Sequence, residues 1–151
     1  MGKRRLAREF ALQILFQLDI TRDPLQEGIE LFWAARDQSP EVKEFANQLA
    51  TGTLEHLAFI DQCICRYSEK WTITRMPTVD RNVLRLATYE ILFLPEIPDR
   101  VSINEALEIA RDYGTDESVP FVNGILDKIA RDKDELLSSP GLPRDRGPKP
   151  E

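Results

Sequence analysis

The feature that most constrains this chain is the spacing of its apolar residues, which recur three and four positions apart along most of its length. In the first 20 residues, for example, Leu6, Phe10 and Ile14 follow one side of a helix. No segment shows the sustained apolar/polar alternation that a half-buried strand requires. The sequence therefore predicts an all-α fold of about seven helices joined by short polar loops.

The same spacing predicts where the helices lie. The expected ranges are residues 4–20, 25–37, 40–67 with a break at Gly52, 79–94, 102–113 and 118–137. After about residue 137 the chain has several prolines and no apolar periodicity, which is typical of disorder. We therefore expect one helical domain over residues 1–137 and a disordered proline-rich tail over residues 138–151.

Three local signals refine these boundaries. Ser39 before Pro40 predicts a helix start, because serine caps the first free N–H groups and proline suits the first helical position. Ser102 and Glu105 have the spacing of a capping box, which predicts a second helix start at that point. Gly114 is expected to end that helix in a left-handed conformation.

Composition excludes several classes of protein. The chain has a formal net charge of −6 and no apolar run long enough to span a membrane, so we expect a cytoplasmic protein. Its two cysteines, Cys63 and Cys65, are only two positions apart and have no second pair to complete a metal site. They are expected to be reduced thiols, with no bound metal and no cofactor.

No residue pattern favours an enzyme. The one histidine, His56, falls within a helical stripe, where a half-buried structural role is more common than catalysis. Glu90 lies on the apolar face of its helix, so its carboxylate needs a buried partner. We expect that partner to be a helix N-terminus or an arginine, and we expect no catalytic residue.

Charge is distributed unevenly along the chain. Residues 1–22 hold five basic and two acidic side chains and so carry +3, which leaves −9 for the remainder of a chain whose total is −6. The basic residues gather at the start of the first helix, as Lys3, Arg4, Arg5 and Arg8. This asymmetry indicates a local anion-binding site. The alternative is that a basic N-terminus only keeps a frayed end soluble.

A second feature of the first helix is a ridge opposite its main apolar face. Arg5, Arg8, Leu12 and Phe16 align on that side when the sequence is projected on a helix. Two explanations stay open at this point. Either the helix is buried on both sides, or the ridge is a contact surface.

The last helix contains the unusual segment FVNGILDKI. Gly124 costs about 1 kcal/mol relative to alanine within a helix, and its usual role is to let another backbone approach closely. Phe121 could stack on an unpaired base, and Asn123 and Lys128 could contact a base edge or a phosphate. The alternative is that Phe121 belongs to the core and Asn123 only faces solvent.

Four segments together carry a family resemblance. RRLAREFALQILFQLD, DRNVLRLATYEIL, VSINEALEIARDYG and FVNGILDKI, taken in this order and spacing, resemble the NusB family of bacterial transcription antitermination factors. The resemblance covers about Arg4 to Asp132. It implies two packed three-helix bundles and no enzymatic activity. It also implies a heterodimer with the ribosomal protein NusE, which binds single-stranded boxA RNA in the transcription elongation complex and acts notably on ribosomal RNA operons.

The resemblance also implies which residues act. The expected RNA-binding residues are Lys3, Arg4, Arg5, Arg8, Phe16, Phe121, Asn123, Gly124 and Lys128. The expected partner-facing residues are Leu12, Phe16, Asp116, Glu117 and Ser118. With this resemblance, the ridge on the first helix is better interpreted as a contact surface than as core.

The basic cluster is interrupted by Leu6 and Ala7, so we expect modest RNA affinity that depends on the partner. In some relatives a homodimer hides the RNA surface, which is a hypothesis for this chain too. Two rival functions remain: a helical adaptor that binds only protein, and a stand-alone relative of the N-terminal RNA-binding domain of ribosomal RNA cytosine methyltransferases.

Overall fold

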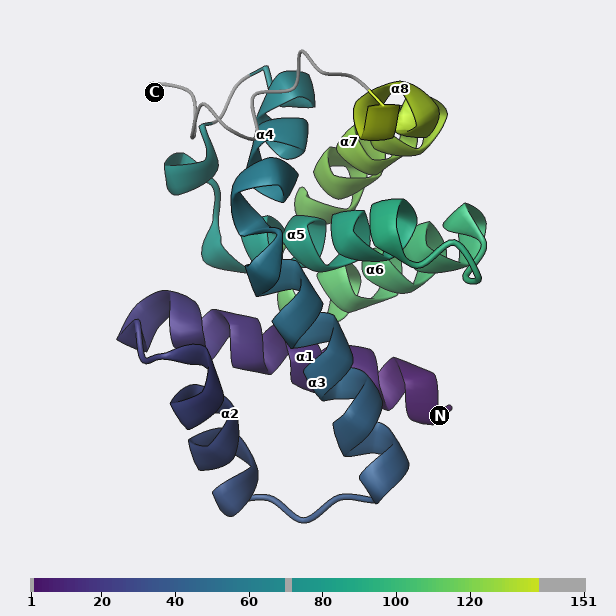
Figure 1. Ribbon diagram of the computed structural model, residues 1–151. Helices are drawn as coiled ribbons and strands as arrows, with labels where there is room; N and C mark the ends of the chain where they lie inside the picture. Colours follow the sequence, from purple (N-terminus) through teal and green to yellow (C-terminus); the bar gives the residue numbers. More distant parts are fainter. Residues whose placement is uncertain (1, 70–71, 139–151) are drawn as a thin grey trace. The chain divides into compact units, whose positions relative to one another are not determined.

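The computed structural model describes residues 2–69 and 72–138, and within these ranges the chain forms eight α-helices, one short 3₁₀ turn and no strand (Figure 1). The predicted all-α fold is confirmed. The described chain falls into two compact units that divide between Glu55 and His56. The expected tail lies almost entirely outside the described residues, so it stays a prediction, as does the single domain over residues 1–137. No helix in the described ranges is both long and apolar enough to cross a membrane.

Unit 1 consists of three helices. They are α1 (Lys3–Thr21), α2 (Leu25–Ala34) and α3 (Pro40–Glu55), and both α2 and α3 pack on α1 (Figure 1). Gly28 favours the close approach of α2 to α1, because a Cβ atom at that position would force the end of the Leu18 side chain to shift. The chain turns sharply between these helices, because Arg22, at the end of α1, has a left-handed conformation with φ 62°.

Aromatic rings hold the core of unit 1. Phe10 of α1 meets Phe32 and Trp33 of α2 edge to face, with ring centroids 6.0 and 5.2 Å apart. Such pairs add to the burial of apolar surface. The indole N–H of Trp33 donates to Oδ1 of Asn47 on α3 over 2.7 Å. This bond ties α2 to α3 and satisfies a polar group that burial would otherwise penalise.

Unit 2 contains the remaining elements. They are α4 (Leu57–Tyr67), the 3₁₀ turn η1 (Ile73–Arg75), α5 (Thr78–Phe93), α6 (Asp99–Tyr113), α7 (Ser118–Arg131) and α8 (Lys133–Ser138). The helices α5, α6 and α7 pack on one another, and α4 packs on both α5 and α7 (Figure 1). The short α8 was not expected as a separate helix.

The central helix α5 is buried from Asn82 to Leu92, polar side chains included. The guanidinium group of Arg85 donates two hydrogen bonds of 2.9 Å to the carboxylate of Asp61 on α4. Glu90 is 1% exposed and accepts a hydrogen bond of 2.9 Å from the hydroxyl group of Ser102 on α6. The expectation that Glu90 is buried and partnered is confirmed, and one of its partners is a hydroxyl group near the start of α6.

Two expectations for α6 are wrong. Ser102 is not a cap, because α6 begins three residues earlier at Asp99, after Pro98 at the N-cap position. Proline fixes φ near the value that precedes a helix, and the buried carboxylate of Glu90 uses the Ser102 hydroxyl. Gly114 ends the helix with φ −103° rather than in the left-handed region.

Two other boundaries also differ from expectation. The helix α3 continues through Gly52, and the break before α4 falls at His56. The helix α2 ends at Ala34 rather than at residue 37. The chain must become extended before Pro40, and the predicted start at Ser39 is confirmed, since the Val42 N–H donates to its hydroxyl oxygen over 3.4 Å.

The bond between Ser102 and Glu90 makes a testable prediction. In the variant Ser102→Ala a buried carboxylate loses a donor, so we expect the free energy of unfolding to fall by about 1–3 kcal/mol. Urea denaturation, monitored by circular dichroism, measures this free energy of unfolding. Asn104→Ala, at an exposed position of the same helix, is the control and should change stability by less than about 0.5 kcal/mol. Equal effects of the two variants would contradict the structural role given to this bond.

Candidate nucleic-acid interface

The first turn of α1 is unusually positive. Lys3 and Arg4 are exposed, Arg5 is half-buried, and the first turn holds no acidic residue. The N-cap residue is Gly2, which provides no side-chain hydrogen bond to the free backbone N–H groups. The positive end of the helix dipole and three cationic side chains therefore coincide, an arrangement that favours a bound anion.

The basic side chains of this first turn contact α3. The Lys3 ammonium nitrogen lies 3.4 Å from a carboxylate oxygen of Glu41. The guanidinium carbon of Arg4 lies 4.4 Å from the centre of the Phe45 ring. The Lys3 pair is exposed on both sides, so solvent screens it and a stronger anion could replace the glutamate.

The predicted ridge of α1 is not a continuous surface. Arg8 and Leu12 are each only 3% exposed, whereas Phe16 is 38% exposed. The guanidinium group of Arg8 lies 5.7 Å from the Phe45 ring rather than in solvent. The expectation of an exposed Arg5–Arg8–Leu12–Phe16 ridge is therefore wrong at its centre, because α1 is buried on more than one side there. The roles assigned to the individual residues stay predictions.

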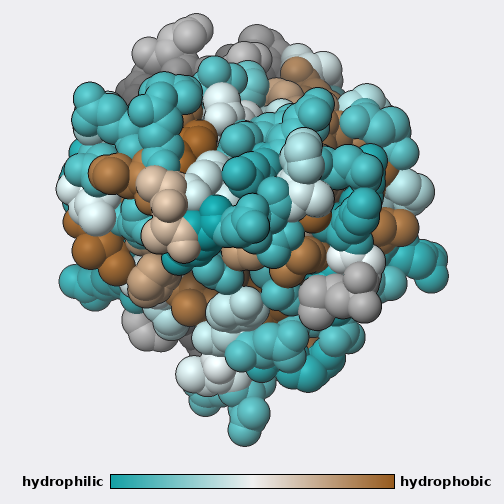
Figure 2. All heavy atoms as spheres, turned by 90° about the horizontal axis from the view of Figure 1, so that it is seen from below, coloured by the Kyte–Doolittle hydropathy of each residue, from teal (hydrophilic) through white to brown (hydrophobic). Residues whose placement is uncertain are grey.

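Exposed apolar side chains do not provide an obvious alternative surface. On the face drawn in Figure 2, hydrophobic residues in brown are interspersed with hydrophilic ones in teal. In unit 1 the large hydrophobic residues that reach the surface are Phe16, Ile20 and Leu31. Charge and local hollows are therefore the features that distinguish candidate binding sites.

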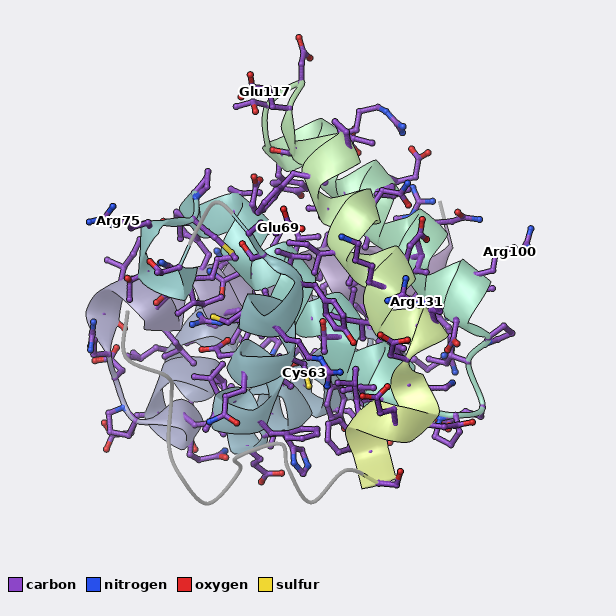
Figure 3. All side chains as sticks on the ribbon, turned by 90° about the horizontal axis from the view of Figure 1, so that it is seen from above. Cys63, Glu69, Arg75, Arg100, Glu117 and Arg131 are labelled. Carbon is purple, nitrogen blue, oxygen red and sulfur yellow. The ribbon has the colours of Figure 1, made fainter. Side chains whose placement is uncertain are left out.

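Unit 2 has a groove of about 600 Å³ beside α7. Phe121, Gly124 and Lys128 line it from one face of that helix, at the i, i+3 and i+7 spacing that places side chains in a row. Facing them are Tyr67 at the end of α4 and Glu69 just beyond it. In Figure 3, Glu69 follows α4, and Glu117, which also lines the groove, lies on the loop that leads into α7. Three of the predicted RNA-binding residues thus share one hollow.

Gly124 lies at an open position on α7. A Cβ atom built on it meets no other atom within 4 Å, and the residue is exposed. No other part of the described chain lies against Gly124, so a close approach at this position is left to a binding partner and stays a prediction.

Tyr67, which lines the groove, is held in place by residues at the end of α7. The Tyr67 hydroxyl group donates to Oδ2 of Asp132 over 2.6 Å, and Arg131 donates two bonds of 2.9 Å to the same carboxylate. The bonds from Arg131 and Tyr67 hold the pKa of Asp132 well below its usual range. Burial, together with the bond to Asp132, raises the pKa of Tyr67 to about 12.

The loop before α7 is fixed by a buried serine. The Ser118 hydroxyl group donates to Oδ1 of Asp80 over 2.6 Å and accepts a bond of 3.0 Å from the Thr115 N–H. Ser118 is 1% exposed and its hydroxyl group is used inside unit 2, so burial does not favour its predicted partner-facing role, which stays a prediction. Asp116 and Glu117 are exposed, as a partner-facing role would require.

Sequence reasoning placed some groove residues and missed others. Asn123 is half-buried and does not line the groove. Tyr67 is the last residue of α4 and Glu69 lies just beyond it, and neither was predicted because apolar spacing carries no information at a helix end. Phe45, which backs Arg4, was not among the predicted site residues.

The described residues offer no arrangement typical of bond-making chemistry. No group of histidine, cysteine and acidic side chains there could hold a metal ion. His56 stacks on Phe93 with ring centroids 4.1 Å apart. Neither Cys63 nor Cys65 forms a disulfide bond, and burial raises the pKa of the Cys63 thiol to about 12, so that this thiol stays protonated (Figure 3).

Comparison with known proteins decides the family. The NusB family model matches residues 5–131. The chain belongs to the NusB family. The transcription antitermination protein NusB of Thermodesulfovibrio yellowstonii is 48% identical over 87% of this chain and 93% of its own length. The NusB of Desulfitobacterium hafniense is 54% identical over 83% of this chain and 86% of its own.

Solved NusB structures have the same fold. T. maritima NusB is 44% identical, covers 91% of this chain and 97% of its own, and has a TM-score of 0.79. A structure described as the antitermination factors NusB and NusE in complex with dsRNA is 25% identical, covers 87% of this chain and 98% of its own, and also has a TM-score of 0.79. The protein is therefore a transcription antitermination factor of a non-enzymatic RNA-binding family, and the expectation that it is not an enzyme is confirmed.

The geometry of Tyr67 makes a prediction about pH. In the folded protein the Tyr67 hydroxyl group keeps its proton up to about pH 12, whereas a tyrosine with the ordinary pKa of 10.0 loses its proton at lower pH. The resulting stabilisation is complete below pH 10 and is lost as pH rises through 12. We expect stability to fall more steeply over this window in the wild type than in Tyr67→Phe, measured by urea midpoints. Parallel curves for the two proteins would show that Tyr67 does not have the raised pKa.

Proposed function

We propose that this protein binds single-stranded boxA-type RNA as a heterodimer with the ribosomal protein NusE, and that this complex promotes antitermination on ribosomal RNA operons. The observation that carries the proposal is the first turn of α1, where exposed Lys3 and Arg4 and half-buried Arg5 coincide with uncapped backbone N–H groups and no acidic residue. A site built in this way attracts phosphates although the whole chain carries a net charge of −6.

The groove beside α7 supports the same function in a different way. Phe121 offers an aromatic surface for an unpaired base, and Lys128 offers a cation for a neighbouring phosphate. Gly124 leaves the groove open between them. Asn123 does not line it, so a contact from Asn123 to RNA stays a prediction without structural support.

The proposed protein partner follows from a relative. The 25% identical NusB described above was solved in complex with NusE and RNA, which supports the same pairing here. Asp116 and Glu117 are exposed beside the groove and could meet basic groups of that partner. We place the complex in the bacterial cytoplasm, on the transcription elongation complex. A homodimer of the free protein stays a prediction, which light scattering at several concentrations tests.

The N-terminal cluster is tested by removing its accessible charges. In the variant Lys3→Ala/Arg4→Ala/Arg5→Ala, affinity for boxA RNA in the presence of NusE should fall by about tenfold or more. The slope of log affinity against log salt should also fall by about 0.7 for each phosphate that is no longer neutralised. Fluorescence anisotropy with labelled RNA at several salt concentrations gives both quantities. Arg8 is left in place because its side chain is buried.

A matched triple variant controls for net charge. Arg75, Arg100 and Arg111 are exposed, and their joint replacement by alanine removes the same three charges elsewhere. We expect this control to keep near wild-type affinity. Equal affinity of the two triple variants would overturn the proposal. A protein that binds NusE but never RNA would be the protein-only adaptor instead.

Gly124→Ala separates binding by the groove from stability. Because no atom lies within 4 Å of the added methyl group, the helix should gain about 0.5–1 kcal/mol of stability. The same methyl group enters the groove, so RNA affinity should fall although the protein becomes more stable. Thermal denaturation and anisotropy measure the two changes. A more stable variant with unchanged RNA affinity would exclude the groove from the RNA interface.

A further inference from the structure

A second, smaller groove lies entirely within unit 1. It has a volume of about 290 Å³ and is formed by the first turn of α1 and one face of α3. The α3 residues that line it are Glu41, Glu44, Phe45 and Gln48, and their i, i+3, i+4 and i+7 spacing places them on one side of the helix. The family resemblance assigned no α3 residue to RNA binding, so this face has no assigned role.

Arg4 is the notable residue of this groove. It is exposed, and its guanidinium carbon lies 4.4 Å from the centre of the Phe45 ring. Within residues 2–69 and 72–138 it forms no hydrogen bond or ion pair, whereas Lys3 is paired with Glu41. A planar guanidinium group backed by a ring on one side can accept a second planar group on its other side.

The remaining lining residues favour a base over a phosphate. The carboxylates of Glu41 and Glu44 repel a phosphate from the groove but accept hydrogen bonds from the amino groups of a base. The amide of Gln48 can both donate and accept, as the recognition of base edges requires. Phosphates are then left to the cations at the rim, Lys3 and Arg4.

We propose that Arg4, supported by Phe45, stacks on an unpaired nucleobase of the bound RNA, and that α3 contacts this base through Gln48. The inference rests on the proposed RNA-binding function and adds α3 to its interface. Arg4 acts here as a stacking platform in addition to a charge. Phe45 is a positioning residue, because it touches the guanidinium group and not the RNA.

The variant Arg4→Lys distinguishes stacking from charge. Lysine keeps the positive charge, so the salt dependence of binding should stay as in the wild type. It lacks the planar group, so affinity for single-stranded boxA RNA should fall by about fivefold or more. Fluorescence anisotropy at several salt concentrations measures affinity and salt slope together.

A spectroscopic signal locates the base directly. Single-stranded RNAs that carry 2-aminopurine at one position at a time report stacking as a change in fluorescence. At one position we expect a change with the wild type that is lost with Arg4→Lys. A purely structural role of Arg4 would not produce a signal confined to one nucleotide.

The chain offers a matched control for this variant. Arg36 of unit 1 is exposed, and its guanidinium carbon lies 3.8 Å from the centre of the Phe32 ring, yet it lines neither groove described above. Arg36→Lys makes the same chemical change at another arginine–phenylalanine pair. It should leave RNA affinity and 2-aminopurine fluorescence unchanged.

The outcomes separate this inference from the proposed function. If Arg4→Lys binds like the wild type while the triple alanine variant is weakened, charge alone acts at Arg4 and the inference is overturned. If the triple variant also binds normally, the proposed function fails as well. A loss of affinity with an altered salt slope, or one equalled by Arg36→Lys, would also contradict the stacking role.

Discussion

Unit 2 depends on the burial of polar side chains along α5. Three of them each take a partner from a different neighbouring helix: Arg85 bonds Asp61 of α4, Glu90 bonds Ser102 of α6, and Asp80 bonds Ser118 of α7. Leaving one member of a buried ion pair without its partner costs about 3–5 kcal/mol. A helix that slides or rotates against α5 breaks one of these bonds. They therefore select one arrangement of the helices from the several that apolar packing alone would allow.

This constraint reaches the groove through Asp80. The carboxylate of Asp80 lies in the first turn of α5, where the helix dipole favours negative charge, and it accepts the bond that anchors the first residue of α7. Once that residue is fixed, helical geometry sets the direction of Phe121, Gly124 and Lys128. The buried bond between Ser118 and Asp80 and the groove residues at the surface thus belong to the same rigid helix, α7. A binding site on a helix held in this way is defined more sharply than one on a loop.

Much of the fold follows from the sequence because helical spacing and proline are strong local signals. The ranges of α1 and α5 were predicted closely for that reason, as was the start of α3. The start of α6 was misplaced because Ser102 and Glu105 satisfy a local pattern, while the hydroxyl of Ser102 is used by a residue twelve positions away. A capping box is a local pattern, and only the packed helices show that its serine is already bonded.

In the candidate site, too, some features could be predicted from the sequence and others depend on packing. The basic first turn was evident from the distribution of charge, and Phe121, Gly124 and Lys128 from the unusual segment FVNGILDKI and the family resemblance. The burial of Arg8 and Leu12 was not, since a projection of one helix shows which residues share a side but not how many neighbours cover it. Phe45 and Tyr67 gain a functional meaning only through what lies beside them, Arg4 in one case and the groove in the other.

An acidic protein that binds RNA must limit where the polyanion can approach. Glu69 and Glu117 line the groove of unit 2, and Glu41 and Glu44 line the groove of unit 1. These carboxylates disfavour phosphate inside either hollow, while the neighbouring cations attract it to the rim. An RNA strand that satisfies both conditions keeps its backbone outside and turns its bases inward. Paired bases cannot turn in this way without losing their partners, which is the physical reason for proposing a single-stranded RNA ligand.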